Sequence, residues 1–173
     1  MTTFLNIALL SCVAIGALTD LFTKKIYNLL TLPLALFGLA FHAYTTGLSG
    51  AAFALSGLGV GLALYLPLCI GGIMGAGDAK LLGAIGAVAG WRMAVSVGFY
   101  ALIIGGLIAL FILFVTRRFS PWLSDMKRFL ISFLVPGYDL QLPHLQQCHW
   151  MPYGPALLLA LIGMQGGILT PLL

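Results

Sequence analysis

The chain of 173 residues contains only four acidic side chains: Asp20, Asp78, Asp125 and Asp139. Asp78 stands in the stretch GAGDAK (75–80), between a glycine-containing segment and an apolar run. Two carboxylates that lie close together and are partly removed from water cannot both ionise easily, so such a pair shares one proton. The ionised member can take a proton from water while the protonated member polarises a peptide carbonyl, as in an aspartic protease. Whether Asp78 has such a partner depends on the elements that position it.

The composition is that of an integral membrane protein. Hydrophobic residues make up 61% of the chain and charged residues 7%, whereas soluble domains carry about 25% charged residues. The length predicts one compact all-α domain over residues 1–173. No Lys or Arg precedes the first apolar segment, so we expect a retained helix rather than a cleaved signal peptide.

Six apolar segments are candidates for membrane-spanning helices. They are residues 4–19, 28–44, 51–73, 79–91, 93–116 and 152–173. The stretch TTGLSG (45–50) is the predicted turn between the second and third helices. The fourth segment is short and rich in glycine, which suits a helix packed inside the bundle.

Glycines four residues apart predict close helix packing, because small residues let two backbones approach each other. The pairs are Gly57 with Gly61, Gly71 with Gly75, and Gly86 with Gly90. The alternative is that glycine is tolerated in these helices without any specific contact.

The basic residues predict the topology. With six spans and the N-terminus outside, the cytoplasmic segments are 20–28, 74–80 and the longer loop 117–151 before the last helix. These segments contain all eight Lys and Arg residues except Arg92, in agreement with the positive-inside rule. Omitting the short fourth span would put the basic cluster of the long loop outside. That loop is predicted either as an interfacial helix or as a solvated loop.

In this topology Asp20 ends the first helix and Asp78 begins the fourth, both on the cytoplasmic side. Ionisable residues near membrane spans are costly, and they point to function by default. Gly75 and Gly77 would let the backbone bend and approach a ligand, and the nearby Lys80 would favour ionised Asp78.

Purely structural interpretations of Asp20 and Asp78 are alternatives. Asp78 is also a preferred helix-capping residue, and Asp20 is spaced to form an ion pair with Lys24. A proton- or cation-coupled transporter would use such carboxylates too.

Three stretches, in the same order as in the family, resemble type IV prepilin peptidases. GAGDAKLLGAIGAVAGW (75–91) resembles the GxGD signature, and TDLFTKKIYNLLTLPL (19–34) resembles the segment around the family's first aspartate. MPYGPALLLALIG (151–163) resembles the start of the family's last helix. Tyr27 departs from the pattern, since proline is usual there, and this departure concerns the turn rather than the chemistry.

The resemblance implies a membrane aspartic endopeptidase with Asp20 and Asp78 as the catalytic pair. Gly75 and Gly77 would shape the loop that receives the substrate backbone, and Lys80 would be part of the same substrate-binding segment. The substrate would be a prepilin or pseudopilin, whose short basic leader is removed after a glycine. The site would lie near the cytoplasmic face of the bacterial inner membrane.

The resemblance is to the short, peptidase-only form of the family, as in systems that process small Flp-type pilins. The N-terminal region with paired C-x-x-C motifs that accompanies methylation in larger members is not present in this sequence, so we expect no methylation. No metal, organic cofactor or nucleic acid is expected. The three cysteines form no C-x-x-C pair, and the three histidines are expected to be structural or interfacial; these residues are Cys12, Cys69, Cys148, His42, His144 and His149.

Two other classes of function remain alternatives. One is the carboxylate-using transporter, and the other is a non-catalytic pilus assembly factor that keeps the same fold. The sequence does not identify the pilin, the oligomeric state, or which aspartate is the acid and which the base, since a coupled pair titrates as a unit.

Overall fold

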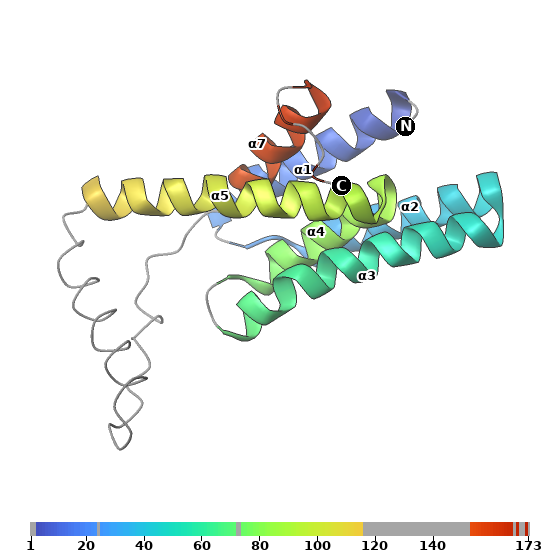
Figure 1. Cartoon of the computed structure of the whole chain (residues 1–173), viewed down its shortest axis with the longest axis horizontal. Coiled ribbons are helices and arrows are strands. Elements are labelled where there is room, and N and C mark those ends of the chain that lie inside the picture. The colour runs from blue at the N-terminus through green and yellow to red at the C-terminus, as the bar shows by residue number, and fades with distance from the viewer. Residues whose placement is uncertain are drawn as a thin grey trace, which may run out of the picture. The chain divides into compact units, whose positions relative to one another are not determined.

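The computed structural model describes residues 3–23, 25–71, 74–115, 153–167, 169 and 172. These residues form helices and connecting turns without a strand, which confirms the all-α prediction for this part of the chain (Figure 1). The helices are α1 (Thr3–Thr23), α2 (Asn28–Thr46), α3 (Leu48–Ile70), α4 (Ala76–Ala89), α5 (Trp91–Val115) and α7 (Tyr153–Gln165).

The chain divides into two compact units. The first unit comprises residues 1–105 and 152–173 and contains both candidate catalytic aspartates. The second unit comprises residues 106–151, of which the structure describes only Gly106–Val115, the C-terminal part of α5. The predicted cytoplasmic loop 117–151 therefore lies outside the described residues.

Four of the described helices are long and apolar enough to cross a membrane: α1, α2, α3 and α5. The helices α4 and α7 have 14 and 13 residues, which corresponds to about 21 and 20 Å of rise, against about 30 Å of hydrocarbon core. The protein is thus a helical membrane protein, whereas the six-span topology with an external N-terminus stays a prediction.

Several predicted boundaries are wrong, including those at the turn after α2 and at the end of α7. The turn predicted over residues 45–50 consists of Gly47 alone, because its positive φ of 65° reverses the chain between α2 and α3 within one residue. The last helix, predicted over residues 152–173, ends at Gln165. It ends there because Gly167 adopts a positive φ of 72°, a conformation that commonly terminates helices.

The short helix α4 packs against α3 backbone to backbone, as the glycine spacing predicted. A side chain on Gly57 would lie 2.0 Å from the carbonyl oxygen of Gly86, and one on Gly61 would lie 2.7 Å from the carbonyl oxygen of Leu82. The glycines therefore allow a helix separation that a methyl group would prevent. The prediction of close helix approach is confirmed for these residues, but Gly71 and Gly75 instead end α3 and precede α4.

On its other side, α4 packs against α2, so that α2, α3 and α4 lie side by side (Figure 1). A side chain on Gly38 of α2 would lie 2.8 Å from the carbonyl oxygen of Ala87. His42 donates a hydrogen bond from Nε2 to the carbonyl oxygen of Val88 at 2.9 Å. The last carbonyl groups of a helix have no partner within that helix, so His42 caps the C-terminal end of α4. The structural role expected for this histidine is confirmed.

The packing of α3 on α4 predicts opposite results for two glycines of α3. Gly57→Ala should lower the free energy of unfolding by about 1–3 kcal/mol, because its methyl group must separate the helices. Gly59→Ala is the matched control: nothing lies within 4 Å of its added methyl group, and the change should be neutral or stabilising by up to about 1 kcal/mol. Thermal unfolding in detergent measures both, and equal stability of the two variants would contradict this packing.

Candidate active site

Asp20 lies inside the last turn of α1, because that helix continues to Thr23 rather than ending at residue 19 as predicted. Its side chain is buried, with 5% of its surface exposed. The predicted ion pair with Lys24 involves a residue outside the described part of the chain. Burial of a carboxylate in a helix that is otherwise apolar calls for compensation from nearby polar groups.

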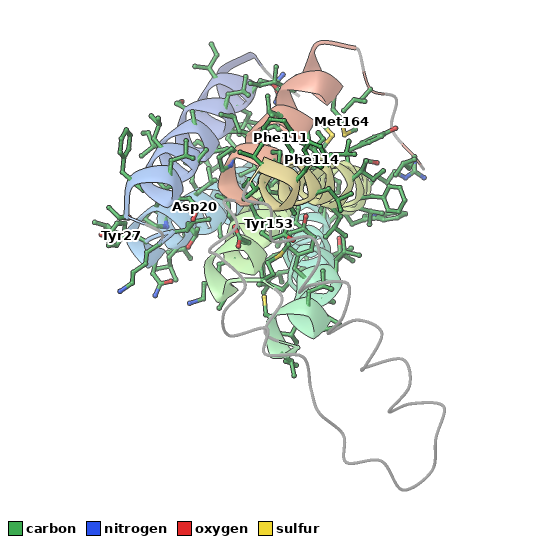
Figure 2. All side chains as sticks on the ribbon, turned by 90° about the vertical axis from the view of Figure 1, so that its left-hand side faces the viewer. Asp20, Tyr27, Phe111, Phe114, Tyr153 and Met164 are labelled. Carbon is green, nitrogen blue, oxygen red and sulfur yellow. The ribbon has the colours of Figure 1, made fainter. Side chains whose placement is uncertain are left out.

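One compensating group comes from the start of α7. The backbone N–H of Gly154 donates a hydrogen bond to Oδ2 of Asp20 at 2.9 Å. A side chain on Gly154 would lie 2.9 Å from Cβ of Asp20 and 3.1 Å from Cα of Ala17. The absence of a side chain thus lets the first turn of α7 reach the carboxyl group. Asp20 and Tyr153 mark the neighbouring ends of α1 and α7 in Figure 2.

Asp78 lies in the first turn of α4 and is also buried, with 6% of its surface exposed. The residue that precedes this helix is Gly75, so Asp78 is not the N-cap itself. Its carboxyl group instead accepts a hydrogen bond from the Gly75 backbone N–H, the return contact of a capping box. The other oxygen, Oδ1, is buried and has no hydrogen-bond partner among the residues that the structure describes.

The two aspartates interact electrostatically. Burial raises the pKa of Asp78 from its usual 3.8 to about 7, and the charge of Asp20 contributes to this increase. The hydrogen bond from Gly75 acts in the opposite direction. Asp78 lies outside the four long apolar helices. The arrangement combines two buried carboxyl groups from α1 and α4, and burial holds the pKa of Asp78 well above its usual value.

Two side chains of α3 that the sequence did not single out lie near Asp78. Tyr65 is fully buried, donates a hydrogen bond to the carbonyl oxygen of Gly98 at 2.9 Å, and interacts electrostatically with Asp78. Cys69 donates from Sγ to the carbonyl oxygen of Gly75 at 3.4 Å and accepts a hydrogen bond from the backbone of Ala79. No motif pointed to either residue, because both contacts depend on the way α3 packs.

The three predicted substrate-binding residues have different surroundings. Gly75 provides the backbone N–H that Asp78 accepts. Gly77 packs against the segment before α2, since a side chain there would lie 2.9 Å from Cβ of Ile26. Lys80 donates from Nζ to Oδ1 of Asn28 at 2.9 Å. Gly77 and Lys80 thus tie the start of α4 to the start of α2.

Lys80 and Asn28 also line a cavity of about 460 Å³ between α2, α3 and α4. Most of its other lining residues are apolar; they include Leu29, Leu32, Leu58 and Leu62. Among the described residues, no three His, Cys, Asp or Glu side chains group together as metal ligands would. Asp125, Asp139, His144, His149 and Cys148 lie outside the described residues.

Comparison with known families gives one match. The sequence profile described as the type IV leader peptidase family matches residues 7–110. The match includes Asp20 and the GAGDAK stretch, and it ends before α7. A search among curated proteins and a search among solved structures found no match.

The raised pKa of Asp78 predicts how Asp78→Asn affects stability. Between about pH 4 and 7 the folded protein keeps a proton on Asp78 that the unfolded chain releases, so this contribution to stability falls as the pH rises. At pH 8 the parent therefore contains a buried charge that the variant lacks. We expect Asp78→Asn to raise Tm by about 3 °C or more at pH 8, and by less at pH 5.

Thermal unfolding of both proteins in detergent at the two pH values measures this difference. Gly59→Ala is a suitable control, because it changes no titratable group and its Tm offset should be the same at both pH values. An offset for Asp78→Asn that does not change with pH would show that the pKa of Asp78 is close to its usual value in the folded protein.

Proposed function

We propose, from the premise that the chain belongs to the type IV leader peptidase family, that it cleaves its substrate as an aspartic endopeptidase. Membership of this family makes the chain a protease of the leader peptidase type. The finer proposal is that Asp20 and Asp78 form the catalytic pair. The proposed substrate is a type IV prepilin or pseudopilin, cut between its short basic leader and its apolar helix at the cytoplasmic face of the bacterial inner membrane.

The observation that carries this proposal is the electrostatic interaction between two buried carboxyl groups from separate helices. A chain with only four acidic residues has two of them buried close to each other. Burying a second carboxyl group beside the first costs stability, and a purely structural role would be served better by a neutral side chain. The buried Oδ1 of Asp78 adds support, since it has no hydrogen-bond partner among the described residues, and such a group costs stability that a purely structural role does not require.

The reaction follows from a pair that holds one proton. The ionised carboxylate takes a proton from a water molecule, and the water oxygen attacks the carbonyl carbon of the scissile peptide bond. The protonated carboxyl group donates its proton to the carbonyl oxygen, which gives a tetrahedral intermediate. The intermediate collapses as the C–N bond breaks: the protonated carboxyl group gives its proton to the leaving nitrogen, and the other carboxylate takes a proton from a hydroxyl group of the intermediate. The products are a leader with a new C-terminal carboxylate and a mature chain with a free amine.

Gly75, Gly77 and Lys80 are the proposed substrate contacts beside this pair. They belong to the segment that leads into α4 and its first turns, directly next to Asp78 in the sequence. The absence of side chains on the two glycines lets the backbone of this segment pack closely, at Gly75 beside Asp78 and at Gly77 beside Ile26, and an extended substrate segment is proposed to run along it. The lipid bilayer is the medium in which the apolar helix of the substrate reaches the enzyme.

Replacing either aspartate tests the proposed catalytic pair. Asp20→Asn and Asp78→Asn keep the size of the side chain but cannot share the proton, so each should lower kcat at least about 1,000-fold. The substrate is a prepilin-like peptide with a basic leader, a glycine and an apolar helix, in detergent or liposomes. Gly59→Ala should cleave like the parent, and thermal unfolding confirms that the Asn variants are folded. Parental cleavage rates in both Asn variants would exclude the pair and favour the transporter alternative.

The pKa of Asp78 also predicts the pH dependence of cleavage. The pair needs one proton, and the pKa of Asp78 is about 7, so kcat/KM should fall as the pH rises through about 7. The profile is measured at constant ionic strength with a substrate that contains no histidine, so that the substrate itself does not titrate in this range. A kcat/KM that stays constant between pH 6 and 9 would contradict the role of Asp78 as the proton carrier.

A further inference from the structure

The first turn of α7 contains a backbone N–H that has no acceptor within its own helix. The first four N–H groups of any helix lack such an acceptor, and here Pro155 has no N–H at all. A residue next to the helix normally provides the acceptor through its side chain. For Gly154 the acceptor is instead Oδ2 of Asp20, a residue of α1 that lies 134 positions earlier in the chain.

The contact leaves little room on either side. Gly154 belongs to a regular helix whose next residue, Pro155, has a fixed φ angle. A side chain on Gly154 would lie within 3.1 Å of the backbone of Ala17 and within 3.0 Å of the Asp20 side chain, so α7 and α1 are in direct contact at this point. Because an N–H group can only donate, Oδ2 of Asp20 is the acceptor in this contact.

We propose that Gly154 is a positioning residue of the active site, and that its backbone N–H holds Oδ2 of Asp20 so that this carboxyl group faces the reacting water in one orientation. This inference rests on the proposed function of Asp20 as a catalytic residue. It adds a third element, α7, to a site that otherwise consists of groups on α1 and α4. Gly154 lies outside the region that matches the family profile, residues 7–110.

Positioning and plain helix capping predict different kinetics. A cap that only stabilises α7 affects the amount of folded protein, whereas a group that orients Asp20 affects the rate of the chemical step. Loss of the N–H should therefore lower kcat and leave KM unchanged, because the substrate still binds but the carboxylate is misplaced. One hydrogen bond to a charged group corresponds to roughly a tenfold to hundredfold change in rate.

Replacing Gly154 by glycolic acid removes this N–H without adding a side chain. The full chain is made by cell-free translation into nanodiscs with a tRNA that carries glycolic acid. The matched control replaces Leu161, in the second half of α7, by its α-hydroxy analogue. This control also loses one backbone hydrogen bond of the same helix, but not a contact with Asp20. Cleavage of the prepilin-like peptide and thermal unfolding are measured for the parent, both esters and Asp20→Asn.

The expected result is that the Gly154 ester has a kcat tenfold to hundredfold lower than that of the Leu161 ester, with equal KM and similar Tm. Equal kcat values for the two esters, in a protein that Asp20→Asn inactivates, would overturn the role of Gly154 while the proposed function stands. A parent that does not cleave the peptide, or an active Asp20→Asn, would instead refute the proposed function.

Gly154→Ala provides a second variant that standard expression can produce. Its methyl group would lie 2.9 Å from Cβ of Asp20, so either the carboxyl group or α7 must move. We expect a loss of kcat at least as large as that of the ester, again with unchanged KM. A folded Gly154→Ala protein with parental kcat would also overturn the inference.

Discussion

The burial of α4 is the constraint on which the rest of this structure depends. From Asp78 to Val88 every residue of this helix except Lys80 is buried, and its neighbours are helices α2 and α3. The separation between these helices is set by peptide groups in contact, at Gly57 with Gly86 and at Gly38 with Ala87. Peptide groups have no rotamers, so such contacts position a helix more sharply than flexible side chains do. Asp78 lies in the first turn of α4, so the packing of α4 also fixes the position of Asp78.

Asp20 is positioned by a different kind of contact, a hydrogen bond from the backbone of α7. Asp20 belongs to a long apolar helix, and the backbone of α7 contacts it directly through Gly154. Each of the two buried carboxyl groups thus accepts a backbone N–H at the start of a helix, Asp20 at α7 and Asp78 at α4. Helix N-termini have a partial positive charge, which offsets part of the cost of burying negative groups. The protein achieves this with few cations: it has eight Lys and Arg residues in total.

The sequence predicted those features that depend on local pattern. Long apolar runs predicted α1, α2, α3 and α5, and the glycine spacing predicted the contact between α3 and α4. The ends of α1 and α7 were missed, because hydropathy measures apolarity and not the place where the chain turns. Gly166 and Gly167 after Gln165 were a readable stop signal for α7.

The surroundings of the candidate site could not be predicted in the same way. The roles of Tyr65 and Cys69 depend on contacts between distant elements, and a lone tyrosine or cysteine in an apolar helix has no distinguishing pattern. Gly154 is an intermediate case. The stretch MPYGP was noticeable in the sequence, but its contact with Asp20 joins residues 134 positions apart. Only the packing of α7 on α1 shows that the backbone N–H of Gly154 donates to Oδ2 of Asp20.

The capping and catalytic interpretations of Asp78 are compatible, because they involve different oxygens of its carboxyl group. One oxygen accepts the N–H of Gly75 and so completes the first turn of α4, while Oδ1 has no partner among the described residues. Removing the cap function alone would need a change at Gly75, whereas a change of Asp78 removes both functions together. The fold thus fixes one oxygen of this carboxyl group through Gly75, and the proposed reaction would use the other. Such a division of tasks would let a residue type that is common at helix starts also serve the proposed catalytic role.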